Sequence, residues 1–139
     1  MHGKPHHAIL LVDDEESIAK ALQRLFRREH YDIRVAHGGE EALRVLQDTE
    51  TPFSLIVSDQ RMPGMSGVEF LERAKILSPL SIRILLTGYS DVNAIVDAVN
   101  RGQIHRYMTK PWNDEEMLLV VRQSIEQYEL VTENLRLQE

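Results

Sequence analysis

Phe53-Ser54-Leu55-Ile56-Val57-Ser58 is a short, mostly apolar run that leads directly into Asp59. Three further runs have the same form, at residues 8–12 before Asp13-Asp14, at 82–86 before Thr87-Gly88, and at 104–109 before Lys110-Pro111. Short apolar runs bounded by polar or turn residues are typical of buried strands in a parallel sheet. We therefore expect each run to be a strand with a polar residue at its carboxyl end.

The segments between these runs have helical periodicity. Apolar residues recur at helical spacing in 16–29, 40–48, 68–77 and a segment through 92–99 that Asp91 caps, and a last helix starts near Asn113. A further short strand, at 32–35, alternates polar and apolar residues. Strands and helices that alternate in this way predict a flavodoxin-like, doubly wound α/β fold. Its expected form is a five-stranded parallel sheet in the order 2-1-3-4-5 with five helices.

The composition fits one globular domain and excludes several classes of protein. The chain has 139 residues, 42% of them hydrophobic, and no cysteine, which rules out a disulfide scaffold. No apolar run approaches the roughly 18 residues of a membrane span, and residues 1–7 lack the apolar core of a signal peptide. A net charge of −6 argues against direct nucleic-acid binding. We expect a soluble cytoplasmic domain with no membrane contact and a disordered tail at 1–7.

The residues that follow the strands are expected to meet at one site, because ligands of an open parallel sheet bind beyond the carboxyl ends of its strands. Asp13, Asp14 and Asp59 would crowd like charges there, which raises carboxyl pKa values unless a cation is present. Mg²⁺ suits such a site because it takes carboxylate oxygens and leaves room for water and phosphate. A Gly-rich nucleotide loop is excluded, since residues 13–16 are all acidic.

Asp59 is the candidate nucleophile of this site. An aspartate can attack a phosphoryl group and form an acyl phosphate, a transfer that needs charge neutralisation more than acid–base help. The Lys110 ammonium can pair with phosphate, and the Thr87 hydroxyl can donate to a phosphate oxygen. Gly88 lets the backbone approach closely. Each of these residues therefore has a part in phosphoryl transfer to Asp59.

Taken together, the motifs resemble the response-regulator receiver domain of two-component signalling, over residues 8–128. They occur in the family's order: the acidic pair Asp13-Asp14, the phosphoacceptor Asp59 with its Met-Pro-Gly turn through Gly67, the switch pair Thr87-Gly88, the switch aromatic Tyr107, and Lys110-Pro111. Each motif alone is weak, and five in order are highly specific.

The resemblance implies a Mg²⁺ site and a phosphorylation switch. Asp14, Asp59 and the backbone carbonyl of Arg61 would bind Mg²⁺ directly, Asp13 would bind it through water, and Lys110-Pro111 would be a cis peptide. A histidine kinase or a phosphotransfer protein would donate the phosphoryl group. Thr87 and Tyr107 would then move and change the face made by the fourth helix, the fifth strand and the fifth helix. Such a domain promotes its own phosphorylation but is no conventional enzyme.

The chain departs from the family's pattern at three positions. Gln60 is polar where the family usually has an aliphatic residue, Arg61 flanks the path of the attacking water, and Tyr89 is an aromatic two residues past the switch Thr. These departures bear on the lifetime of the phosphoryl group, not on its formation. Residues 87–91, 102–107 and 110–112 also resemble receivers joined to HD-GYP cyclic-di-nucleotide phosphodiesterases, which implies a further output domain in cis.

Two other functions fit the sequence less well. A Mg²⁺-dependent phosphatase similar to the haloacid-dehalogenase group would carry a second Asp two residues after the nucleophile, where this chain has Arg61. A phosphate-independent, receiver-like module for dimerisation or interaction would be expected to lack an acid or the Lys. For single residues, Asp13-Asp14 as helix caps, Thr87 as a plain strand end and Tyr107 as a fixed core aromatic remain open.

The carboxyl-terminal helix carries a second signal. A heptad-like seam with alternating spacings of three and four is formed by Leu118, Val121, Ile125, Tyr128, Thr132 and Leu135. The first part must pack on the domain, which is complete by its strand count near Tyr128. We expect 129–139 to extend the last helix as a connector to an output domain or as a homodimer helix, the alternative being a frayed polar end.

Overall fold

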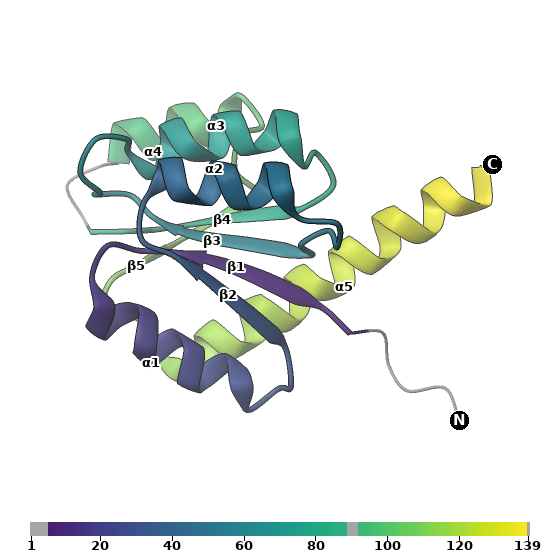
Figure 1. Cartoon of the computed structure of the whole chain (residues 1–139), viewed down its shortest axis with the longest axis horizontal. Helices are drawn as coiled ribbons and strands as arrows, with labels where there is room; N and C mark the ends of the chain where they lie inside the picture. Colours follow the sequence, from purple (N-terminus) through teal and green to yellow (C-terminus); the bar gives the residue numbers. More distant parts are fainter. Residues whose placement is uncertain (1–5, 89–91, 139) are drawn as a thin grey trace.

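The computed structural model of the chain describes residues 6–88 and 92–138 (Figure 1). The strands are β1 (Ala8–Val12), β2 (Asp32–Ala36), β3 (Leu55–Asp59), β4 (Ile82–Thr87) and β5 (Arg106–Thr109), all parallel, in the order β2-β1-β3-β4-β5. The helices are α1 (Glu16–Arg27), α2 (Gly39–Asp48), α3 (Gly67–Leu77), α4 (Val92–Asn100) and α5 (Asp114–Gln138). The expected flavodoxin-like fold and its strand order are confirmed.

Helices cover both faces of the sheet (Figure 1). On one face α1 and α5 pack over alternate strand residues, so that Phe26 and Val121 share a cluster with Val57. On the other face α2, α3 and α4 pack over the intervening residues, with Phe70 and Ile95 in the same cluster as Ile56. Every residue of β3 is buried, as expected of a central strand covered from both sides.

Two strands start later than the apolar runs predicted. β3 begins at Leu55 and includes Asp59, whereas the run starts at Phe53, and β5 begins at Arg106 instead of Ile104. Phe53 and Ile104 are nevertheless 5% and 4% exposed, and both pack into the core on the α2–α4 side. The apolar residues at the start of these runs therefore indicate burial, and the buried segment begins before the first residue that pairs with a neighbouring strand.

Helix ends agree with the sequence to within two residues. α1 ends at Arg27 and not at Glu29, because the backbone N–H groups of Arg28, Glu29 and His30 bond three residues back in a tightened last turn. At the start of α5, Asn113 is the cap, since its side-chain oxygen accepts from the Glu116 backbone at 3.1 Å. Asp91, the expected cap of α4, lies outside the described residues.

α5 packs on the sheet only in its first part. Leu118, Val121 and Ile125 of the predicted seam are 0–5% exposed, so this half of the seam belongs to the domain's own core. The end of the helix projects from the body (Figure 1), and Leu130 and Leu135 are exposed there. Within the described ranges, no helix is long and apolar enough to cross a membrane.

Gly67, the first residue of α3, lies directly against the backbone of Asp59. A Cβ on Gly67 would stand 2.2 Å from the Asp59 carbonyl oxygen and 2.8 Å from Leu85 Cδ1, and neither atom can move freely. We predict that Gly67→Ala lowers the free energy of unfolding by about 3 kcal/mol, as overpacking of a well-packed site does. Urea denaturation measures this, with Gly38→Ala as the control, since a Cβ on Gly38 has nothing within 4 Å. Equal, small losses in both variants would contradict the prediction.

Candidate functional site

The polar residues that follow the strands do meet at one edge of the sheet. β1 pairs with β3 so that Val12 lies beside Ser58, which places Asp13 next to Asp59. The next pairs bring in the neighbouring strands, because Asp59 lies beside Leu86 of β4 and Thr87 lies beside Thr109 of β5. Lys110 follows Thr109 directly. The parallel register alone therefore gathers the carboxylates, the hydroxyl and the ammonium.

Three carboxylates form the centre of this edge. One oxygen each of Asp13, Asp14 and Asp59 lies within 4.8 Å of the others, a spacing that one metal ion can bridge. Asp13 and Asp59 are 1% and 4% exposed, whereas Asp14 faces solvent. Two acids are thus buried beside each other, with the third available at the mouth of the site.

The Asp13 carboxylate is only partly satisfied by the protein. Its Oδ1 accepts from the backbone N–H of Glu15 at 2.8 Å, but its buried Oδ2 has no hydrogen-bond partner among the described residues. Burial, and then the charge of Asp59, raise the pKa of Asp13 against the lowering effects of the Glu15 N–H and Lys110. A buried carboxylate oxygen without a donor, in an all-oxygen cluster, fits a hard divalent cation such as Mg²⁺.

Lys110 supplies the positive charge that the structure shows at this cluster. Its Nζ lies 2.8 Å from Asp59 Oδ1 and 3.7 Å from Asp13 Oδ2. Burial alone lowers the pKa of Lys110, but the hydrogen bond to Asp59 and the nearby carboxylate charges outweigh it and raise the pKa. The Lys110 backbone N–H donates to Thr87 O at 2.9 Å, and the Lys110–Pro111 peptide is cis, as expected. The ammonium is therefore held, charged, against the candidate nucleophile.

Thr87 and Tyr107 lie on the same side of the sheet. Thr87 is 1% exposed, and its hydroxyl donates to Gly88 O at 3.1 Å. Tyr107 pairs with Leu85, and Thr109, two residues after Tyr107, pairs with Thr87. The side chains of Thr87 and Tyr107 therefore point to the same face of the sheet, the one that α2–α4 cover. Tyr107 is 52% exposed. The alternative that Tyr107 is a fixed core aromatic is therefore wrong for this structure.

The three departures from the family's pattern have different positions. The Gln60 side chain is buried, and its Oε1 accepts from the Val68 backbone at 2.9 Å. Arg61 is exposed in the loop that follows. Tyr89 lies outside the described residues. Gln60 thus bonds to helix α3, an arrangement that no pattern in the sequence predicts.

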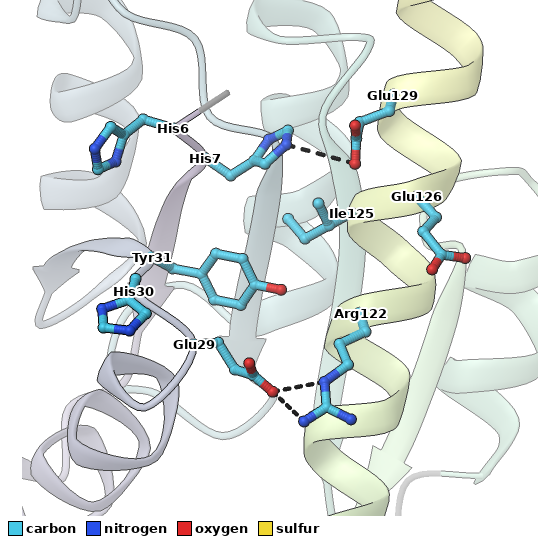
Figure 2. A pocket seen from close by; sticks show the side chains of 9 residues that line it. All are labelled: His6, His7, Glu29, His30, Tyr31, Arg122, Ile125, Glu126 and Glu129. Carbon is cyan, nitrogen blue, oxygen red and sulfur yellow. Dashed lines mark hydrogen bonds and ion pairs between the residues drawn. The ribbon is translucent and has the colours of Figure 1, made fainter. Parts of the chain in front are cut away.

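A cavity lies at the opposite edge of the sheet, where the strands begin. It has a volume of about 630 Å³ and lies between the start of β1, the α1–β2 turn and α5 (Figure 2). His7, which was expected in the tail, is part of its wall: Nδ1 lies 2.7 Å from Ser54 Oγ and Nε2 lies 3.6 Å from Glu129 Oε1. His7 is therefore packed against the domain. No sequence signal distinguished His7 from His6 beside it.

The raised pKa of Asp13 has a consequence for stability. A carboxyl whose pKa is higher in the folded state than its unfolded value of 3.8 stabilises the fold at acid pH, and this contribution is lost as the pH rises through the folded pKa. At neutral pH the ionised Asp13 is therefore a destabilising group while no metal is bound.

We predict that Asp13→Asn raises the free energy of unfolding at pH 7 in EDTA by about 1 kcal/mol, a size common for relief of strain at functional sites. The same variant should gain less stability from added Mg²⁺ than the wild type does, because one anionic group of the cluster is gone. Thermal unfolding with EDTA and with Mg²⁺ measures both effects. A metal-free Asp13→Asn protein less stable than the metal-free wild type would contradict the prediction.

Comparison with known proteins agrees with this geometry. The family model described as the response regulator receiver domain matches residues 9–122. Among curated proteins, the hydrogenase transcriptional regulatory protein HoxA of Cupriavidus necator is 37% identical over 85% of this chain and 24% of its own length. The DNA-binding transcriptional regulator NtrC of Klebsiella pneumoniae is 34% identical over 86% of this chain and 25% of its own. The chain thus spans about a quarter of these relatives.

Solved structures give the same result over nearly the whole chain. The signal receiver domain of an HD domain-containing protein from Pseudomonas fluorescens Pf-5 has a TM-score of 0.87 and 37% identity, covering 96% of each chain. A protein described as adenylate cyclase from Rhodopirellula baltica has a TM-score of 0.92 and 36% identity, covering 96% of this chain and 98% of its own. By its fold, by its acidic edge with Lys110, and by the match to the family model, the chain belongs to the response regulator receiver domain family of two-component signalling.

Proposed function

We propose that this domain accepts a phosphoryl group on Asp59, in a Mg²⁺-dependent reaction, from a histidine kinase or phosphotransfer protein. The observation that carries the proposal is the buried Asp59 carboxylate, with Lys110 Nζ at 2.8 Å and two further carboxylates beside it. A phosphoacceptor role is general for the family, and the three carboxylates, the Lys110 ammonium and Thr87 lie at this edge. The domain belongs to a regulator and not to a conventional enzyme family.

Each residue of the site has its own role in the phosphoryl transfer. A carboxylate oxygen of Asp59 attacks phosphorus, the bond from phosphorus to the donor nitrogen or oxygen breaks, and the leaving group departs with the electron pair and takes a proton from solvent. Asp14, Asp59 and the Arg61 carbonyl would hold Mg²⁺ directly and Asp13 through water, and the ion when bound neutralises the charge on the transferred group. Lys110, now paired with Asp59, would transfer its contact to a phosphate oxygen.

The response to phosphorylation would involve the α4–β5–α5 face. The Thr87 hydroxyl, which now bonds to Gly88 O, would turn to the phosphate, and the half-exposed Tyr107 ring would follow into the space that Thr87 leaves. Both side chains project from the same side of neighbouring strands, which supports their coupling. A local charge would thus bias two arrangements of one face.

We also propose the boundaries of the domain. Residues 1–7 would be a tail of which His7 is docked, 8–128 the receiver domain, and 129–139 the extension of α5 toward an output domain in cis. An HD-GYP phosphodiesterase is the proposed output, supported by the receiver from an HD domain-containing protein among the similar structures. The domain would act in the cytoplasm without direct contact to nucleic acid or membrane, and exposed Leu130, Leu135 and Leu137 would let the extension form a homodimer.

The test is the intact mass of the protein after incubation with acetyl phosphate. With Mg²⁺ we expect a gain of one phosphoryl group per chain, and with EDTA added beforehand we expect none. A wild-type protein that gains no mass with Mg²⁺ would overturn the proposal in favour of a phosphate-independent interaction module. Repeated hydrolysis of a phosphate ester, without a covalent intermediate, would point instead to a phosphatase.

A further inference from the structure

Gln60 makes one hydrogen bond to strand β4 and two to helix α3. Its backbone N–H donates to Leu86 O on β4 at 2.9 Å, and its backbone carbonyl accepts from Gly67 N at 2.9 Å. Its side-chain Oε1 accepts from Val68 N, also at 2.9 Å. The residue is 8% exposed, so these bonds are shielded from water. One residue therefore fixes α3 to the sheet immediately beside Asp59.

These bonds use the amide groups that a helix leaves without partners at its start. The first N–H groups of an α-helix have no acceptor inside the helix. In α3 the first is bonded by the Gln60 carbonyl, the second by the Gln60 side chain, and the third, from Glu69, by Ser66 Oγ at 3.2 Å. Gln60 thus acts as a cap from outside the helix, on the opposite side of the loop from the regular cap Ser66.

The loop between these two anchors is the one that carries the Arg61 carbonyl. Residues 61–66 form a loop that starts after Gln60, at the end of the sheet. The loop ends at Gly67, the first residue of α3, whose backbone N–H donates to Gln60 O. Gln60 therefore closes the base of the loop with both its backbone carbonyl and its side-chain amide. Arg61 is the next residue along the chain, so its backbone directly adjoins the base that Gln60 holds.

We propose that Gln60 is a positioning residue for the metal ion: its side-chain amide closes the base of the 61–66 loop and so aims the Arg61 carbonyl at the carboxylate cluster. This inference rests on the proposed Mg²⁺-dependent function. It assigns to Gln60 a structural part in the assembly of the site. Groups that orient a metal ligand without touching the metal commonly change its affinity by roughly 10-fold or more.

The test compares variants that differ in one acceptor. Gln60→Met keeps the length of the side chain but cannot accept from Val68 N, whereas Gln60→Glu keeps an acceptor there, and a negative charge is favourable at a helix start. Ser66→Ala is the matched control, because it removes a cap of the same helix that has no bond to Gln60. Mg²⁺ affinity is read by calorimetry, and the Val68 amide by hydrogen exchange.

We expect Gln60→Met to weaken Mg²⁺ binding by roughly 10-fold, with faster exchange of the Val68 amide. Saturating Mg²⁺ should restore its rate of phosphoryl uptake, Gln60→Glu should bind Mg²⁺ at least as tightly as the wild type, and Ser66→Ala should bind it unchanged. Equal affinity in Gln60→Met and wild type would overturn this inference alone, as would equal weakening in Ser66→Ala. A wild type that binds no Mg²⁺ would instead overturn the proposed function together with the inference.

Discussion

Asp59→Asn is expected to take up no phosphoryl group from acetyl phosphate under conditions in which the wild type is fully modified. The amide that replaces the carboxylate has nearly the same shape, so the packing of β3 and the hydrogen-bonding position near Lys110 Nζ, 2.8 Å away in the wild type, are retained. What is lost is the anionic oxygen that attacks phosphorus. Intact mass measured over time reads the result directly.

The control for this variant is Asp48→Asn. Asp48 is an exposed acid at the end of α2, away from the carboxyl edge of the sheet, and its replacement changes the net charge by the same amount. It should leave phosphoryl uptake as in the wild type. Uptake by Asp59→Asn at the wild-type rate would show that another residue accepts the phosphoryl group, with Asp13 and Asp14 the next to test.

Lys110→Met is expected to slow phosphoryl uptake at saturating Mg²⁺ by roughly 100-fold, the usual cost of removing one charged or hydrogen-bonding group that stabilises a transition state. The ammonium lies 2.8 Å from Asp59 Oδ1, so it is placed to meet the charge on the arriving phosphate. Mg²⁺ affinity should not fall, because the loss of a cation leaves the cluster of three carboxylates more negative. The rate of phosphoryl uptake should therefore fall although the Mg²⁺ affinity does not.

The rate is measured by intact mass at several acetyl phosphate concentrations, and the affinity by calorimetry. Lys20→Met is the control, since Lys20 pairs with Glu16 on the exposed surface of α1 and should affect neither quantity. If Lys110→Met kept the wild-type rate, or lost rate only through weaker Mg²⁺ binding, the role assigned to the ammonium would be wrong.

The fold and the membership of the site could be predicted from the sequence because both depend on patterns along the chain. Apolar runs alternating with helical segments determine a parallel sheet, and a parallel sheet brings the residues after its strands to one edge. Asp13, Asp59 and Lys110 therefore meet as expected, whatever the details of packing. The exposure of the Tyr107 side chain needed the structure, since the predicted edge position of β5 does not determine how far its neighbours cover that side chain.

Contacts between residues without a shared pattern could not be predicted. Gln60 is a departure from a family pattern in the sequence, and only the structure shows its side chain accepting from Val68 N. The approach of Gly67 to the Asp59 carbonyl and the bond from His7 to Ser54 are of the same kind, because each depends on how two segments are placed in space. The first half of the α5 seam was predicted to pack on the domain, and Val121 and Ile125 do lie in its core.

The most direct test of the account is to locate the phosphoryl group after uptake. Reduction with borohydride converts an aspartyl phosphate into homoserine, and peptide mass spectrometry then identifies the converted residue. The account predicts homoserine at position 59 in protein treated with acetyl phosphate and Mg²⁺, and none after treatment in EDTA. Homoserine at Asp13 or Asp14, or phosphate on Thr87 without any homoserine, would contradict the assignment of Asp59 as the acceptor.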